Sequence, residues 1–473
     1  MNDLLSKYVT LAHKGAANIQ ELCDLGKRLK DAGFENEGDS CFNACIQALQ
    51  RAIEKGDVEA ALAIESLLYN PFIKSTETEE HYFKCFARWS LQLQELGRKY
   101  NRPLKPDRNR RSVCFVLHTG VLLGHTEVMF RVIDSWIKQG IKCELYVAVI
   151  QGCQPEFKEM LNKRGIKLLQ PRSRSYGAIL AEIRDSLEQR KISTGVWLGP
   201  AVLMGYALAM RLSPRQVVWS VKFHPVWVPE VDVHICGGHE LETTRNYNGH
   251  DWTVAQFPLT LDPIANNPVK VKAIRDLFQP NAIVLGSLAR EEKLKSPEFL
   301  SAVCKLLARN AQAHYIWTGR SQPEMVLSAF KNAGVMDRCH FVGWVDTNLY
   351  AEALDIFLET FPFGCGITGF QSMSHGTPLL SKADADTLYG SQLRGGVMQK
   401  FMRRSLSHAD YETLGILTAA DSQHYVELAQ RLIDDIDFRE EIGAREKAYY
   451  QNERDALPRY AKRLWVNITG LEM

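Results

Sequence analysis

The stretch LETFPFGCGITGFQSMSHGTPLLSK, residues 358–382, decides the fold. It predicts an apolar strand, a glycine-spaced loop, a short helix over residues 369–375 and a second apolar strand. Gly364, Gly366 and Gly369 stand where the strand ends and the helix begins. Glycine lets the backbone approach a ligand closely, and the free N–H groups of a helix N-terminus favour phosphate. We therefore expect this loop to hold the diphosphate of a nucleotide-sugar.

The residues before this stretch alternate between strand and helix patterns. NAIVLGSLA, AHYIWTG, CHFVGWV and DIFLETFPFG predict strands, and helical segments separate them. In the first half, VCFVLHTG, an amphipathic helix and IKCELYVAVI form a strand–helix–strand unit of the same kind. Such units build parallel sheets with right-handed crossovers, and ligands bind outside the carboxyl ends of their strands. We expect two doubly wound α/β domains with an active site in the cleft between them.

Helical periodicity without a convincing strand marks the first hundred residues, and the tail from Ser422 is helical as well. The expected organisation is an all-helical domain at 1–108, a Rossmann-like acceptor domain at 109–270, a Rossmann-like donor domain at 271–445 and a helical tail at 446–473. A chain of 473 residues is long enough for this number of domains.

Composition is that of an ordinary globular protein, with 45% hydrophobic and 24% charged residues. A formal net charge of +2 gives no reason to expect a nucleic acid as partner. The most apolar run is too short to cross a bilayer, and the N-terminus has no signal-peptide pattern. The eleven cysteines are scattered without zinc spacing, which favours reduced thiols. We expect a cytoplasmic protein that is not inserted in a membrane.

Candidate nucleotide contacts gather at successive strand ends of the second half. A fixed cation there would stabilise the charge that develops on a departing diphosphate. The candidates on this donor side are Ser287, Arg290, Lys293, Lys295, Arg320, Gly343, Trp344, Gly366, Ile367, Thr368 and Gly369.

His125 opens the first crossover helix of the first half, directly after the first strand. Histidine has a pKa near neutrality and serves as a general base, so we expect it to take the proton of an acceptor nucleophile. The alternative is that His125 only caps the helix. Further candidates on the acceptor or sugar side are Gly124, Thr126, Glu127, Lys222 and His224.

No metal site is expected. Asp384-Ala385-Asp386 looks like the Asp-x-Asp pair that holds a metal in some glycosyltransferases, but it follows the wrong strand for that role.

LETFPFGCGITGFQSMSHGTP resembles the donor loop of O-GlcNAc-transferase-like glycosyltransferases. It is most similar to the bacterial branch that modifies high-molecular-weight adhesins in the cytoplasm, where a Phe-Pro-Phe-Gly start is typical. KLKSPEFL resembles the family's donor-lysine segment, and GHTEVMFR and KFHP give looser matches. The resemblance implies a GT-B fold and an all-helical domain before it.

The same resemblance implies an inverting, metal-independent transferase that moves a hexose from a UDP-sugar to a protein side chain. The acceptor would be Asn in a sequon, as in an adhesin before export, or Ser or Thr. His125 would be the base, and either Lys293 or Lys295 would contact the diphosphate. The family has an acidic residue where Gln371 stands. Gln371 can still hydrogen-bond a ribose or sugar hydroxyl.

Two alternatives stay open. A retaining GT-B transferase acting on a glycan or lipid has a glutamate at the position of Gln371 and another at that of Phe363, and neither is acidic here. A catalytically decayed, transferase-like binding protein would also fit the change at Gln371. The retained histidine, lysines and glycine loop favour an enzyme.

Overall fold

The computed structural model describes residues 19–31, 34–75, 88–104, 111–221, 226–237, 243–247, 249–255, 267–361, 364, 367–382 and 417–472. It divides into two compact units. The first contains the described residues up to Gly237, Thr243–Ala255 and those from Lys462 onward, and the second contains those between Gln256 and Ala461.

The first unit begins with a helical region that has no strand among its described residues. Its helices are α2 (Ile19–Asp31), α3 (Glu35–Glu54), α4 (Val58–Ser75) and α6 (Arg88–Arg98). Apolar positions at helical spacing form its core, where Phe72 meets the ring of Phe42 at 6.0 Å and that of Trp89 at 5.0 Å. The region clusters with the α/β part that follows it, so both belong to one unit.

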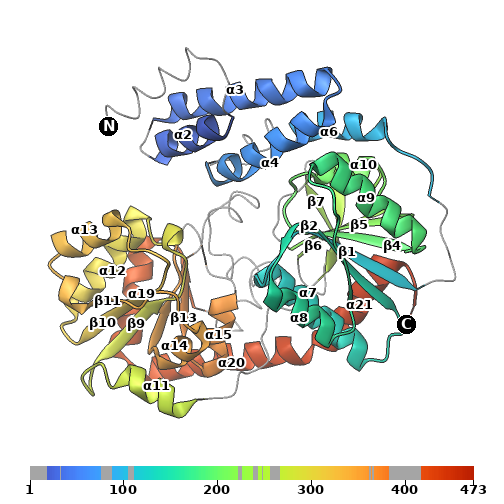
Figure 1. The fold of residues 1–473 in the computed structure, drawn as a ribbon. Coiled ribbons are helices and arrows are strands. Elements are labelled where there is room, and N and C mark those ends of the chain that lie inside the picture. Colours follow the sequence, from blue (N-terminus) through green and yellow to red (C-terminus); the bar gives the residue numbers. More distant parts are fainter. Residues whose placement is uncertain are drawn as a thin grey trace. The chain divides into compact units, whose positions relative to one another are not determined.

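The α/β part of the first unit is an eight-stranded sheet in the order β3-β2-β1-β4-β5-β6-β8-β7. The strands are β1 (Ser112–Gly120), β2 (Glu144–Cys153), β3 (Lys167–Leu169), β4 (Thr194–Leu198), β5 (Arg215–Ser220), β6 (Val233–Gly237), β7 (Thr244–Tyr247) and β8 (His250–Ala255). Its crossover helices are α7 (Gly124–Lys138), α8 (Pro155–Lys163), α9 (Tyr176–Gln189) and α10 (Met204–Ala209), on both faces of the sheet (Figure 1). All pairings are parallel except the β7–β8 hairpin, which the sequence did not predict.

The second unit is built on a six-stranded sheet whose pairings are all parallel, in the order β11-β10-β9-β12-β13-β14. Its strands are β9 (Ile283–Ser287), β10 (Ala313–Trp317), β11 (Cys339–Phe341), β12 (Ile356–Leu358), β13 (Leu379–Lys382) and β14 (Thr418–Ala419). Its helices are α11 (Pro268–Arg275), η2 (Glu291–Lys293), α12 (Pro297–Arg309), α13 (Glu324–Asn332), η3 (Met336–Arg338), α14 (Thr347–Ala353), α15 (Ile367–His375), α19 (Ser422–Asp434) and α20 (Ile436–Asp455). The strand order is that of a Rossmann sheet, with its switch point between β9 and β12.

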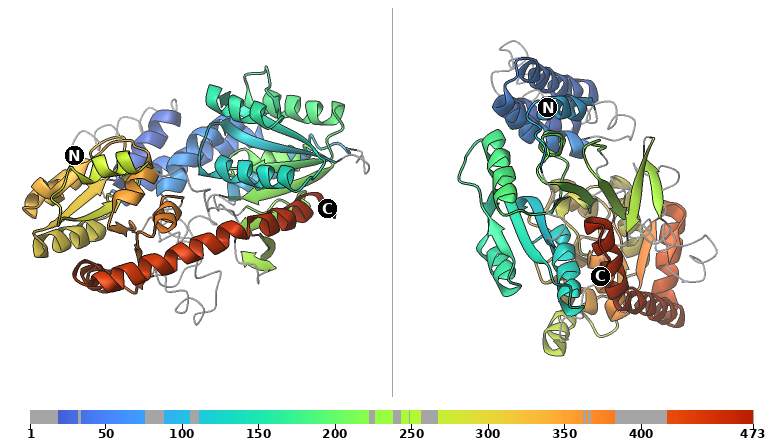
Figure 2. Two further views of the ribbon diagram at one scale, coloured as in Figure 1. Left: turned by 90° about the horizontal axis from the view of Figure 1, so that it is seen from below. Right: turned by 90° about the vertical axis from the view of Figure 1, so that its right-hand side faces the viewer.

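The last helix, α21 (Leu457–Thr469), returns to the first unit from Lys462 onward (Figure 2). Trp465 packs edge-on against Trp136 of α7 at 5.2 Å, and Arg215 Nε donates to the carbonyl of Ile468 at 2.7 Å. The cysteines of the described part are free thiols. No described helix combines the length and apolarity needed to cross a membrane.

Glu65 of α4 joins the helical region to the loop after β4. Its carboxylate accepts a hydrogen bond from Leu203 N at 3.0 Å, and Tyr69 OH accepts one from Ala201 N at 3.2 Å. Leu203 has a φ of 64°, a left-handed backbone conformation that costs a residue with a side chain about 1–2 kcal/mol. Glu65 is only 1% exposed, and this burial raises the pKa of its carboxyl to about 8.

Replacing Glu65 by glutamine should flatten the pH dependence of stability. Because the folded pKa lies above the unfolded one, Glu65 lowers stability progressively as pH rises from about 4.5 to about 8. At pH 7 the loss amounts to about 3 kcal/mol. Melting temperatures at pH 5.5 and 8 should therefore differ less in Glu65→Gln than in the parent. The exposed Glu54→Gln is the control, and an unchanged difference in Glu65→Gln would contradict the assignment.

Candidate functional site

The candidate donor residues lie at the carboxyl edge of the second sheet. Parallel strands bring their carboxyl ends to one edge, and ligands bind there beside the switch point between β9 and β12. The loops after β9, β10, β11 and β12 all reach this edge. We call it the donor edge.

Lys293 reaches the glycine loop. It ends the short 3-10 helix η2 after β9, and its Nζ donates to the carbonyl oxygen of Gly364 at 2.5 Å. Lys293 is half-buried, whereas the side chain of Lys295 is exposed. The geometry therefore separates two lysines that the sequence could not.

Three side chains continue the donor edge from η2 to the end of β11. A carboxylate oxygen of Glu291 accepts a hydrogen bond from Arg320 N at 3.0 Å, and this bond lowers the pKa of the Glu291 carboxyl. The guanidinium of Arg320 lies 5.0 Å from the ring centroid of Trp344. The structure brings together Arg320 and Trp344, which were each predicted as a nucleotide contact. Glu291 was missed, although it stands between the predicted Arg290 and Lys293.

Helix α15 begins at Ile367, two residues earlier than predicted, so Ile367, Thr368 and Gly369 form its first turn. Gln371 follows on this helix and is 7% exposed. Thr347, the first residue of α14, donates its hydroxyl to the amide oxygen of Gln371 at 2.8 Å. The amide nitrogen of Gln371 has no partner among the described residues and remains a donor. Thr347 was also missed, although it follows a strand end like the other candidates.

Two predicted contacts have structural roles instead. Ser287 is 1% exposed, and its hydroxyl donates to the carbonyl of Leu358 at 2.7 Å, which ties β9 to β12. Thr126 is fully buried; its hydroxyl accepts from Leu123 N at 2.9 Å and donates to Val121 O at 2.8 Å. Both polar side chains satisfy backbone groups beside them, which gives each a structural role.

Two further candidates, Gly343 and Arg290, also lie in the loops at this edge. Gly343 has a φ of 74° and accepts a hydrogen bond from Gly319 N at 3.2 Å, which fixes the loops after β10 and β11 to each other. Arg290 is exposed beside η2.

His125 lies in the first turn of α7, at the carboxyl end of β1 in the first unit, and is 7% exposed. Gly124 before it is exposed and Glu127 is half-buried. Lys222 and His224, and Gly366 of the donor loop, lie outside the described residues, as does Asp384-Ala385-Asp386.

A second histidine, His118, occupies the end of β1 and was not predicted as a site residue. Burial lowers the pKa of its imidazole below the ordinary range, and the nearby side chain of Gln151 offsets part of this shift. Gln151 donates to the hydroxyl of Tyr176, which lies 2.8 Å from the hydroxyl of Ser66 on α4. In the sequence, the apolar run of the first strand ends at His118-Thr119-Gly120. This change to polar residues was the signal that could have identified His118.

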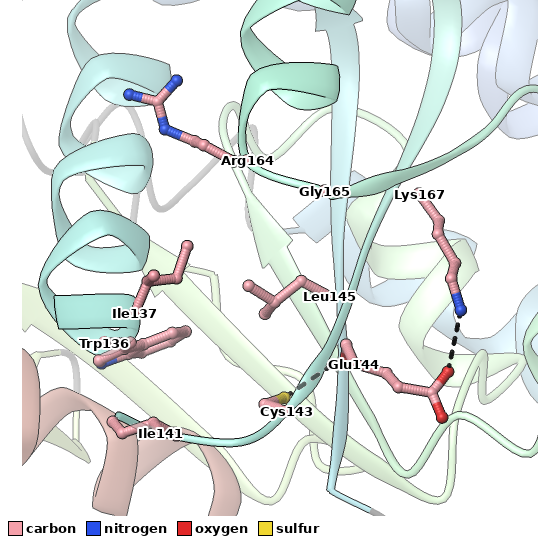
Figure 3. A pocket seen from close by; sticks show the side chains of 9 residues that line it. All are labelled: Trp136, Ile137, Ile141, Cys143, Glu144, Leu145, Arg164, Gly165 and Lys167. Carbon is pink, nitrogen blue, oxygen red and sulfur yellow. Dashed lines mark hydrogen bonds and ion pairs between the residues drawn. The ribbon is translucent and has the colours of Figure 1, made fainter. Parts of the chain in front are cut away.

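A cavity of about 230 Å³ lies elsewhere in the first unit, at the amino ends of β2 and β3 (Figure 3). Trp136, Ile137 and Leu145 form its apolar wall. Two cations also line it: Lys167 forms an ion pair with Glu144 at 3.2 Å, and Arg164 forms one with Asp134 at 2.7 Å. Its cations are already paired, and it does not belong to the carboxyl edge of its sheet. Among the residues described, no three His, Cys, Asp or Glu side chains come together as metal ligands.

Comparison with known proteins identifies the fold. Neither models of protein families nor curated protein sequences match this chain. Among solved structures, a mutant O-GlcNAc transferase of Thermobaculum terrenum is similar over 96% of this chain and 98% of its own, at 15% identity and a TM-score of 0.59. Anabaena HepE, solved with UDP and glucose, covers 76% of this chain with all of its own at 13% identity (TM-score 0.55). A Rickettsia africae glycosyltransferase covers 76% with 99% of its own at 12% identity (TM-score 0.56). The chain has the GT-B fold of these proteins, preceded by a helical region.

Proposed function

We propose that this protein is a glycosyltransferase that moves a hexose from a UDP-sugar to a protein side chain, Asn or Ser/Thr, in the cytoplasm. The observation that carries the proposal is the Lys293 ammonium against Gly364 at the switch point, directly before the N-terminus of α15. A half-buried cation beside helix N–H groups suits a diphosphate. Two similar structures, an O-GlcNAc transferase and a protein solved with UDP and glucose, support this substrate class.

In the proposed reaction the acceptor nitrogen or oxygen attacks the anomeric carbon and inverts it. The bond from that carbon to the phosphate oxygen breaks, UDP departs with the electron pair, and the acceptor proton passes to His125. Lys293 and the first turn of α15 stabilise the charge on the departing diphosphate. This scheme needs no metal ion, because Lys293 and the N-terminal dipole of α15 stabilise the negative charge of the departing diphosphate.

The amide of Gln371 argues against the alternative that this chain is a catalytically decayed binding protein. Thr347 holds its oxygen and leaves its nitrogen as a donor, so it can contact a ribose hydroxyl without being an anion. A glutamine at the position where the resembling family has an acidic residue can therefore still make the proposed contact with the ribose.

The test is intact-mass spectrometry of candidate acceptor proteins incubated with this protein and UDP-glucose, UDP-galactose or UDP-N-acetylglucosamine. Transfer appears as one sugar increment on the acceptor, and peptide fragmentation identifies the modified residue. Thermal shift with UDP alone separates binding from transfer, because a ligand at 100 times its Kd stabilises by about 2.7 kcal/mol. UDP stabilisation without transfer to any protein acceptor would favour a glycan or lipid acceptor or a decayed enzyme, and no UDP stabilisation would refute the donor site.

A further inference from the structure

His314 and His340 form a histidine pair on the second sheet, away from the donor edge. His314 is the second residue of β10, and His340 is the middle residue of the edge strand β11. Ile316 lies opposite His340 across the two strands, and residues two apart on a strand share a face, so both imidazoles stand on one face of the sheet. His314 Nδ1 lies 3.0 Å from His340 Nε2, and both residues are half-buried. The pair brings together two nitrogen ligands that the proposed reaction does not use.

Phe278 packs against both rings of the histidine pair. Its ring centroid lies 5.3 Å from that of His314 and 5.2 Å from that of His340, and the two imidazole centroids are 5.2 Å apart. Phe278 itself packs against the apolar cluster on this face of the sheet, which includes Val284 and Ile316. Packing therefore holds the two imidazoles near each other before any ligand arrives, and such preorganisation lowers the entropy cost of binding.

The separation of the two nitrogens matches that of two imidazole ligands on one metal ion. With metal–nitrogen distances of about 2.0–2.1 Å, two ligand nitrogens lie about 2.9 Å apart at a right angle and about 3.3 Å apart at the tetrahedral angle. The 3.0 Å between His314 Nδ1 and His340 Nε2 falls between these two values. The torsion that turns an imidazole about its Cβ–Cγ bond is broad, so a small rotation directs both lone pairs to one shared ion.

Both imidazoles are in the protonation state that binds a metal. Burial lowers the pKa of His314 and that of His340, so both rings are neutral near pH 7. When an ion replaces the shared hydrogen, the donating ring carries that hydrogen on its other nitrogen, so no proton has to leave. Asp337 and Arg338 are charged neighbours: the carboxylate acts on both rings and favours a cation, whereas the guanidinium, which donates to backbone carbonyls, opposes one.

We propose that His314 Nδ1 and His340 Nε2 bind one divalent transition-metal ion, with water in its remaining coordination positions. Imidazole suits Zn²⁺, Ni²⁺ and Cu²⁺, whereas Mg²⁺ and Ca²⁺ prefer oxygen ligands. The ion ties the edge strand β11 to β10 and stabilises the second unit, because the fold brings the two rings together. His314 stands three residues before the end of β10, about 10 Å from the donor edge, so the ion takes no part in the proposed sugar transfer.

Titration calorimetry and melting temperatures with Ni²⁺, Zn²⁺ and Mg²⁺ test the site. Ni²⁺ and Zn²⁺ should bind and raise the melting temperature of the parent protein, and Mg²⁺ should do neither. His314→Gln and His340→Gln each keep a side chain that can hydrogen-bond the remaining imidazole. Each should weaken the binding of both metals at least about tenfold, since even the loss of a residue that only orients a ligand costs that much. His250→Gln, at an exposed histidine of the first unit, is the control and should bind like the parent.

Two further measurements separate the metal site from a loss of folding and from the proposed function. The rise in melting temperature is taken against the metal-free melting temperature of each variant, so a lower basal stability does not imitate the loss of the site. In the parent, lowering the pH from 7.5 to 5 should weaken binding, because protons compete for the imidazoles. EDTA should remove the added stability and leave UDP binding unchanged.

Three results would overturn the inference. The first is the absence of saturable Ni²⁺ and Zn²⁺ binding to the parent protein. The second is binding that His314→Gln and His340→Gln both retain in full, which would place the ion on other side chains. The third is an affinity that does not change between pH 7.5 and 5, which would exclude imidazole ligands. None of these results affects the proposed donor site, and a failure of UDP to bind would leave the histidine pair unaffected.

Discussion

Replacing His125 by alanine should lower sugar transfer by a factor of about 100 to 10,000, the usual contribution of a positioned general base, and leave UDP affinity unchanged. The donor contacts described above all belong to the second unit, whereas His125 opens α7 in the first. Removing the imidazole therefore affects proton transfer and not nucleotide binding. Single-turnover transfer and UDP calorimetry on the same preparation measure the two effects separately.

His125 is buried, so the alanine variant could disturb the start of α7. His125→Gln fills the same space and keeps a hydrogen-bonding group without a basic nitrogen, and it should lose transfer equally. His118→Gln is the matched comparison at the end of the same strand. Burial lowers the pKa of His118, which makes its imidazole a weaker base than an ordinary histidine, so its loss should cost much less. If His118→Gln abolishes transfer and His125→Gln does not, His118 is the base.

The strand–helix alternation predicted both sheets because apolar runs and crossover helices have distinct periods. The β7 strand was missed because TRNY is short and mostly polar, with only Tyr247 buried. Such an edge strand depends on its partner β8 and not on its own pattern. The start of α15 was placed two residues late because the glycine at 369 suggested a loop, yet it lies inside the first turn.

The common position of the candidate residues was easier to predict than their individual contacts. The sequence placed them at strand ends, and every parallel strand delivers its last residues to the same edge of the sheet. Which side chain serves the backbone and which remains available depends on tertiary contacts. Ser287 and Thr126 bond to carbonyls beside them, while Glu291 and Thr347 became visible only through their partners Arg320 and Gln371.

Helix α20 packs against the turn between α15 and β13 in a way that no local pattern indicated. A Cβ at Gly443 would lie 2.0 Å from the carbonyl oxygen of Gly376, the residue after α15, so only glycine permits this approach. Nearby, the buried carboxylate of Glu446 accepts from Leu379 N at 2.7 Å. Burial raises the pKa of Glu446 well above its ordinary value. Both contacts join residues more than sixty positions apart, which sequence periodicity cannot relate.

Replacing Lys293 by alanine should weaken UDP binding about 10- to 100-fold, as expected for the loss of a charge-assisted hydrogen bond. The ammonium lies 2.5 Å from Gly364 O, where a diphosphate oxygen would compete for the same donor. Lys293→Met keeps the aliphatic packing and should lose the same affinity, so the effect can be assigned to charge. Calorimetry with UDP provides the measurement, and uridine, which has no phosphate, should bind equally to parent and variants.

Lys295→Ala is the matched control, because the two lysines share charge, chemistry and neighbourhood in the sequence but differ in placement. Lys295 is exposed and lies one residue before Ser296, whose hydroxyl caps α12 by accepting from Phe299 N at 3.3 Å. The turn of η2 directs Lys293 to the donor loop, so Lys295→Ala should change UDP affinity less than twofold.

An equal loss in both variants would mean that net positive charge attracts the nucleotide at long range. In that case 0.5 M salt should abolish the difference from the parent, since exposed charges are screened. A specific Lys293–diphosphate contact should retain most of its effect in the same salt, because the ammonium is half-buried.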